Sequence, residues 1–221
     1  MRGHHDHAHP HRPDLEDLPR TYAMLLTDAV ASLLLAKGIV TPDELRATLE
    51  TIDSRSPADG AKVVARAWVD RDFRARLLTD VNAAAAELGI DAGGIPIRAL
   101  ENRPGLHNVV VCTLCSCYPR LLLGPPPDWY KSRAYRSRVV REPRAVLAEF
   151  GLVLPEETEI LVHDSTAELR YLVLPGRPPG TEGWGEAELA AIVTRDCLIG
   201  TAVPRLPTAQ RNGPGVAPGA A

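Results

Sequence analysis

Residues 108–117 read Asn108-Val109-Val110-Val111-Cys112-Thr113-Leu114-Cys115-Ser116-Cys117, and they join an apolar run to three of the chain's four cysteines. The run of valines predicts a buried strand, and the cysteines follow it on a turn. Sulfurs spaced this closely can hardly avoid one another, and thiolates are the ligands that soft metals prefer. The segment therefore predicts a metal site at the end of a strand.

Composition restricts the class of protein. The chain has 221 residues, 45% of them hydrophobic, which is enough for a buried core, and its net charge of -3 gives no broad basic surface for nucleic acid. The longest apolar stretch, residues 29–36, is too short to cross a bilayer, and no signal-peptide layout precedes it. Four unevenly spaced cysteines do not form a disulfide framework. We expect a soluble, cytoplasmic protein that binds neither nucleic acid nor membrane.

The first half of the chain has a helical pattern. Apolar residues recur at helical spacing over residues 25–34, and Gly38 is a typical helix stop. Thr41-Pro42-Asp43-Glu44 has the form of a capping box that begins a second helix. Further helices are predicted over 61–69, after the start signal at 56–57, and over 73–88.

The second half mixes strands and helices. Short strands are predicted over residues 97–100 and 107–111, and helices over 128–141, 143–150 and 186–195. Strands over 159–163 and 169–174 flank a polar turn, so an antiparallel pairing is expected. The fold class is α+β. The predicted domains are a disordered histidine-rich tail (1–13), a helical arm (14–90), a metal-binding globular domain (91–206) and a disordered tail (207–221).

The spacing of the cysteines suggests an unusual ligand set. Cys115, Ser116 and Cys117 can offer two sulfurs and two backbone nitrogens in one plane, with Cys112 beneath it. A backbone amide gives up its proton only to a strongly polarising metal such as a trivalent one, and one position then stays open for catalysis. The alternative is a zinc site with His107 or His163 as the fourth ligand, in a non-catalytic interaction module.

Several segments together resemble the α subunit of nitrile hydratase, closely over residues 98–199. They are Val111-Cys112-Thr113-Leu114-Cys115-Ser116-Cys117-Tyr118 and the segments at 125–131 (PPPDWYK), 138–144 (RVVREPR), 167–175 (AELRYLVLP), 180–184 (GTEGW) and 193–196 (VTRD). This resemblance implies a fold with a helical arm and a layered α-β-β-α globule. It also implies an enzyme that hydrates a nitrile to the corresponding amide.

The resemblance also implies the ligands and partners of the site. A low-spin trivalent ion would be held by the sulfurs of Cys112, Cys115 and Cys117 and by the backbone nitrogens of Ser116 and Cys117. Cys115 would be oxidised to a sulfinic acid and Cys117 to a sulfenic acid. Thr113 favours Co³⁺ over Fe³⁺. A β-type subunit, in one chain or split into two, would complete the site with two arginines, and a helper protein would insert the metal.

Two departures bear on the substrate. Arg120 stands where nitrile hydratases usually have tryptophan, and in this it resembles the metal subunit of thiocyanate hydrolase, which forms carbonyl sulfide and ammonia. A guanidinium beside Tyr118 in a substrate pocket would bind an anion; a salt bridge across a subunit interface is the alternative. A glutamine common near the nitrile hydratase pocket is replaced around Gly93. The substrate is therefore a small nitrile or thiocyanate.

The remaining candidates are given mostly structural roles. Asp164 is expected either to hydrogen-bond to the site, as in the family, or to serve the predicted turn. The histidine-rich tail suggests a third hypothesis, a cobalt-delivery protein. Other conspicuous side chains are expected to serve packing or structural hydrogen bonds: His107, His163, Trp129, Tyr130, Tyr135 and Cys197.

Overall fold

The structure, a computed structural model, describes residues 20–207. The chain divides into two compact units, one that ends at Glu50 and one that begins at Thr51. The predicted tails at 1–13 and 207–221 lie outside the described residues, apart from Pro207. Within the described part, no helix combines the length and apolar character needed to cross a membrane.

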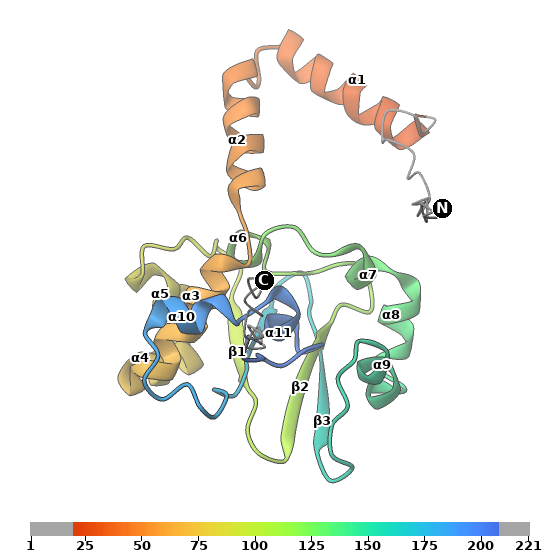
Figure 1. Ribbon diagram of the computed structural model, residues 1–221. Helices are drawn as coiled ribbons and strands as arrows, with labels where there is room; N and C mark the ends of the chain where they lie inside the picture. The colour runs from red at the N-terminus through yellow and green to blue at the C-terminus, as the bar shows by residue number, and fades with distance from the viewer. Residues whose placement is uncertain (1–19, 208–221) are drawn as a thin grey trace, which may run out of the picture. The chain divides into compact units, whose positions relative to one another are not determined.

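The first unit contains helix α1 (Tyr22–Ala36) and most of α2 (Pro42–Ser54) (Figure 1). After α1 the chain turns at Gly38, which has a positive φ of 64° that glycine adopts without strain. The predicted capping box at the start of α2 is confirmed, because the Thr41 N–H donates to Glu44 Oε2 at 2.8 Å and the Glu44 N–H donates to Thr41 Oγ1 at 3.2 Å. No residue of α1 is buried.

The second unit begins its helices with α3 (Ala58–Val69), α4 (Arg71–Thr79) and α5 (Val81–Glu87). The sequence predicted one helix over residues 73–88, whereas the structure has two. Asp80 breaks the helix because its backbone is extended and its carboxylate accepts the N–H of Ala83, which caps α5.

Two later helices are also divided at capping residues. The predicted helix over 128–141 is α7 (Asp128–Lys131) and α8 (Arg133–Arg138), separated at Ser132, whose hydroxyl caps α8. The predicted helix over 186–195 ends early as α10 (Glu186–Ala191), and Thr194 then caps α11 (Arg195–Ile199). The described part of the chain also contains α6 (Arg120–Leu123) and α9 (Pro143–Glu149).

The strands form two small parallel sheets. Strand β1 (Ile97–Glu101) pairs with β4 (Arg170–Leu174), and β2 (Leu106–Val111) pairs with β3 (Glu159–Asp164). The expected antiparallel pairing of 159–163 with 169–174 is therefore wrong. Helices α6 to α9 form a connection between β2 and β3 that is long enough for a parallel crossover, and the short segment after β3 carries the chain to the other sheet.

Helices cover the sheets, so the predicted α+β class is confirmed. Helices α4 and α5 contact β1, α9 contacts β3, and α11 contacts both β2 and β4 (Figure 1). Buried residues of α3 to α5, including Val63, Phe73 and Leu77, share one hydrophobic core with the strands. For this reason the structure divides the chain at residue 50, earlier than the boundary at residue 90 in the sequence-based domains.

Gly200 allows close packing behind the strand that carries the cysteines. It caps α11 with a φ of 93°, and a Cβ at this position would overlap the carbonyl of Asn108 and lie 2.9 Å from the Cα of Val109. The Gly200 carbonyl also lies 2.7 Å from His107 Nε2. The end of α11 thus packs against the backbone of β2 and holds this strand in place.

Replacing Gly200 should therefore destabilise the protein more than replacing a glycine of similar φ in open space. Gly151 has a φ of 77° and no atom near its missing Cβ. We expect Gly151→Ala to lower the free energy of unfolding by about 1 kcal/mol through backbone strain, and Gly200→Ala by about 3 kcal/mol because steric overlap is added. Denaturant titration of both variants measures this; equal losses would contradict the packing described.

Candidate metal centre

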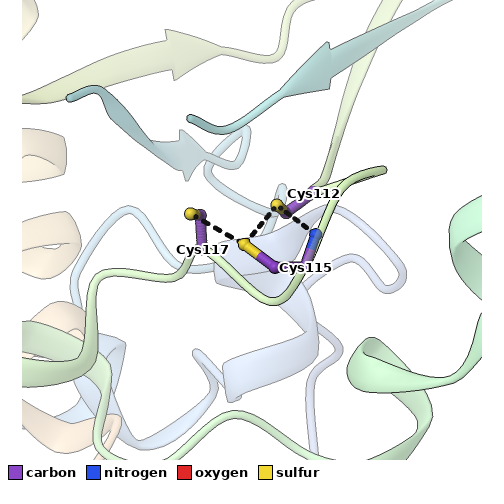
Figure 2. Close-up of side chains that lie close together, drawn as sticks. All are labelled: Cys112, Cys115 and Cys117. Atoms are coloured by element: carbon purple, nitrogen blue, oxygen red, sulfur yellow. Dashed lines mark hydrogen bonds between the residues drawn. The ribbon is translucent and has the colours of Figure 1, made fainter. Parts of the chain in front are cut away.

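The cysteine turn, residues 112–117, follows directly from the end of β2 at Val111 and leads toward α6. Its three thiols face one another: the sulfur of Cys115 lies 3.4 Å from that of Cys112 and 3.3 Å from that of Cys117 (Figure 2). The Cys115 N–H points back to the Cys112 sulfur at 3.3 Å. The structure thus brings together the three sulfurs that the sequence predicted as ligands.

The three thiols differ in exposure, and Cys115 and Cys117 also differ in acidity. Cys112 is buried, Cys117 is half-buried and Cys115 is exposed. Hydrogen bonds from the thiols of Cys117 and Cys112 and from the backbone N–H of Ser116 lower the pKa of Cys115 to about 7. Burial raises the pKa of Cys117 to about 12. Of these two residues, the exposed Cys115 is therefore the one that forms a thiolate more readily, where an incoming metal ion can reach it.

The donor set fits a metal ion bound by sulfur and peptide nitrogen. The backbone N–H groups of Ser116 and Cys117 both contribute to the lowered pKa of Cys115, so they lie near its sulfur. The three sulfurs lie within 4.8 Å of one another. Two amide nitrogens therefore lie beside three convergent thiols, which is the combination that the spacing of the cysteines suggested.

The four-ligand zinc alternative lacks a fourth side chain. Among residues 20–207, the group of ligating side chains around the turn contains only the three cysteines. His107 Nε2 lies 2.7 Å from the Gly200 carbonyl, and His163 Nε2 lies 2.8 Å from Asn108 Oδ1. These two histidines have the structural roles expected of them. Cys197 is buried beside Thr194 and does not join the cluster.

Asp164 supports the turn from the neighbouring strand. The parallel register places it opposite Val111, the last residue of β2. Its carboxylate accepts the Thr113 N–H at 2.9 Å and the Thr113 hydroxyl at 2.5 Å. Because both bonds go to one residue between two cysteines, Asp164 fixes the course of the backbone through the turn. Of the two roles considered for this aspartate, hydrogen bonding to the site is the observed one.

The sequence analysis did not single out two arginines near the turn. Arg136 donates from Nη1 to the Thr113 carbonyl at 3.3 Å. Burial is the largest effect on the pKa of the Cys117 thiol and raises it. The positive charge of Arg170, on β4, acts in the opposite direction and lowers it. The Nε of each arginine is buried without a partner in the described part of the chain. Arg170 lies in the quoted segment 167–175, but only the strand order reveals its closeness to the cysteines.

A hollow of about 250 Å³ adjoins the segment that follows the cysteines, and its lining includes Tyr118, Arg120, Arg170, Gly93 and Leu121. The Tyr118 ring is buried and its hydroxyl has no partner within the described residues. The Arg120 side chain is exposed. At position 93 a side chain would collide with Leu121. The two residues predicted for a substrate pocket therefore line one hollow, together with a second arginine.

Comparison with protein families and curated proteins gives consistent matches. The family model described as nitrile hydratase, alpha chain, matches residues 21–202. The low-molecular weight cobalt-containing nitrile hydratase subunit alpha of Rhodococcus rhodochrous is 48% identical, over 90% of this chain and 98% of its own length. Thiocyanate hydrolase subunit gamma of Thiobacillus thioparus is 45% identical, over 82% of this chain and 79% of its own length.

Solved structures agree with these matches. Recombinant thiocyanate hydrolase comprising partially modified cobalt centres matches with a TM-score of 0.79 and 41% identity, covering 89% of this chain and all of that one. A double mutant of the Fe-type nitrile hydratase from Comamonas testosteroni Ni1 matches with a TM-score of 0.77 and 44% identity, covering 91% of this chain and all of that one. Similar proteins thus include both activities and both metals.

Proposed function

The chain belongs to the nitrile hydratase α-chain family, and from this premise we propose that it is the metal-binding catalytic subunit of a cobalt nitrile hydratase. The observation that carries the proposal is the convergence of the three thiols of the cysteine turn, whose backbone also contains the peptide nitrogens of Ser116 and Cys117. The proposed ligands are the sulfurs of Cys112, Cys115 and Cys117 and the backbone nitrogens of Ser116 and Cys117.

The proposed metal is Co³⁺. Relatives described as cobalt-containing and the threonine at position 113 support it, while an Fe-type neighbour makes Fe³⁺ the alternative. We further propose that Cys115 is oxidised to a sulfinic acid and Cys117 to a sulfenic acid. The exposure of Cys115 and its lowered pKa favour this oxidation, because thiolates react with oxidants more readily than thiols.

In the proposed reaction, one water adds across the carbon–nitrogen triple bond. Its oxygen bonds to the nitrile carbon and both of its protons end on the nitrogen, which gives the amide. When bound, a trivalent ion supplies the Lewis acidity that polarises the nitrile or the water. In this route the oxygen of an oxidised Cys117 would accept a proton from the attacking water. In the alternative route that oxygen would itself bond to the nitrile carbon, its bond to sulfur would break on release of the amide, and the oxygen of the water would replace it on the sulfur. In both routes the positive charge of Arg170 would offset the negative charge of the oxidised Cys117.

We propose that a partner of β type, in one chain or two, completes the site. The relatives are described as subunits, and Leu114 at the tip of the turn is 88% exposed. Six apolar side chains of α1 are also exposed, which is costly without a partner: Tyr22, Met24, Leu25, Leu26, Val30 and Leu33. A helper protein would load the metal.

We also propose that the protein is cytoplasmic. All four cysteines are free thiols, which suits the reducing cytoplasm.

Three measurements on the purified complex test the proposed function: metal analysis, intact mass and nitrile turnover. We expect one cobalt for each copy of this chain, and a mass gain of roughly 48 Da from three oxygens on two cysteines. Stoichiometric zinc bound to unmodified thiols would contradict the proposal and favour a non-catalytic module. Deleting residues 1–13 should leave the cobalt content unchanged; its loss would support the delivery hypothesis instead.

A thiocyanate hydrolase subunit is the second candidate, and Arg120 favours it. Arg120 lines the hollow, and its guanidinium makes no hydrogen bond or ion pair with the other residues of the described part. A free guanidinium next to a small hollow suits a small anion such as thiocyanate. The gamma subunit of thiocyanate hydrolase is also 45% identical to this chain. The alternative role for the Arg120 side chain is a salt bridge with a carboxylate of the partner subunit.

Replacing Arg120 distinguishes these uses. If Arg120 binds the substrate anion, Arg120→Trp should lower kcat/KM for thiocyanate by roughly tenfold or more, as expected for the loss of a charged hydrogen bond, while kcat/KM for a small neutral nitrile holds or rises. Arg103→Trp, on the β1–β2 turn, controls for the bulk and charge change. An unchanged ratio of the two activities, with weaker assembly of the complex, would assign Arg120 to the subunit interface.

A further inference from the structure

A cluster of aromatic rings from α7, α8 and the residue that follows α9 lies beside the cysteine turn. The cluster is tight: the Trp129 ring lies 4.8 Å from that of Tyr135 and 4.7 Å from that of Phe150, and the Tyr130 ring lies 5.8 Å from that of Tyr135. Tyr130 is fully buried and Tyr135 is 5% exposed. The sequence analysis expected only packing from these rings.

The two tyrosine hydroxyls point out of the cluster and donate to backbone carbonyls near the two ends of the turn. Tyr130 Oη donates to the Cys117 carbonyl at 2.8 Å, and Tyr135 Oη donates to the Val110 carbonyl at 2.7 Å. Val110 lies two residues before the first cysteine of the turn, and Cys117 is the last. The hydroxyls therefore hold the segment at both ends.

We infer that Tyr130 and Tyr135 are positioning residues that hold the cysteine turn in its metal-binding shape before the metal arrives. The inference rests on the proposed function, because it takes the cysteine turn as the metal site. Among residues 20–207, the hydroxyls hydrogen-bond to backbone carbonyls and make no hydrogen bond to a sulfur, so both act through the backbone. Their rings are locked by neighbouring rings, and a hydroxyl on a locked ring fixes a carbonyl more firmly than a mobile side chain would.

The two contacts are not equivalent. The Cys117 carbonyl belongs to the residue whose own nitrogen and sulfur are both proposed ligands, so its orientation sets the direction of two donors at once. The Val110 carbonyl lies in β2, which is also held by its pairing with β3. The loss of the Tyr130 hydroxyl should therefore disturb the site more than the loss of the Tyr135 hydroxyl.

The test compares Tyr130→Phe and Tyr135→Phe in the complex with its partner subunit. Each substitution keeps the ring and removes one hydroxyl, leaving a backbone carbonyl without this donor. We expect metal to be lost to a chelator roughly tenfold faster in Tyr130→Phe and severalfold faster in Tyr135→Phe. We also expect a shifted sulfur-to-metal charge-transfer absorption band in Tyr130→Phe. Tyr171→Phe is the control, because the Tyr171 hydroxyl makes no hydrogen bond within residues 20–207.

The outcomes separate this inference from the proposed function. Retention is measured for whichever metal the purified complex contains, so a complex with another metal or without nitrile turnover would refute the function and still test the tyrosines. Retention and an absorption band equal to those of the unchanged complex would overturn the inference. A lower melting temperature with unchanged retention and band would assign the hydroxyls to stability alone and would overturn it as well.

Discussion

The parallel register between β2 and β3 is the constraint on which the site depends. It aligns Val111 with Asp164, so the last residue of one strand stands beside a carboxylate at the end of the other. The chain leaves β2 at this point, and the carboxylate accepts two hydrogen bonds from Thr113. A shift of one residue would turn Asp164 to the opposite face of the sheet and release the turn. The sheet is small, but its pairing decides where three sulfurs meet.

The turn is held at several points by other parts of the second unit. Asp164 and Arg136 bind the backbone of Thr113, while two tyrosines bind carbonyls at its ends. These contacts use the backbone of the turn and leave the sulfurs free to face one another. Such an arrangement suits a cluster that accumulates negative charge, because its support does not compete for the ligating atoms. The positive charge of Arg170 also acts on the Cys117 thiol.

Local patterns in the sequence predicted the separate parts of the fold well. The apolar run before the cysteines is β2, the capping box begins α2, and Gly38 follows α1 with a positive φ. Each of these features depends on neighbours in the chain. The divisions of helices at Asp80 and Ser132 were missed, because aspartate and serine occur both as caps of a new helix and on the polar face of a continuous one.

The pairing of strands that are far apart in the chain could not be predicted from local sequence patterns. A polar segment between two strand patterns is typical of a hairpin, yet here it connects different sheets, because each strand finds its partner earlier in the chain. For the same reason Arg170 could not be placed near Cys117, from which it is separated by more than fifty residues. The three cysteines were identifiable because they are close in sequence, whereas their supporting residues converge only through the fold.

X-ray absorption at the metal edge of the purified complex tests the central claim most directly, since it reports which atoms surround the ion. The account predicts a first shell that contains both sulfur, from the three cysteines, and low-Z neighbours that include the two peptide nitrogens of the turn. A closed tetrahedral shell of four sulfur or imidazole ligands would contradict it.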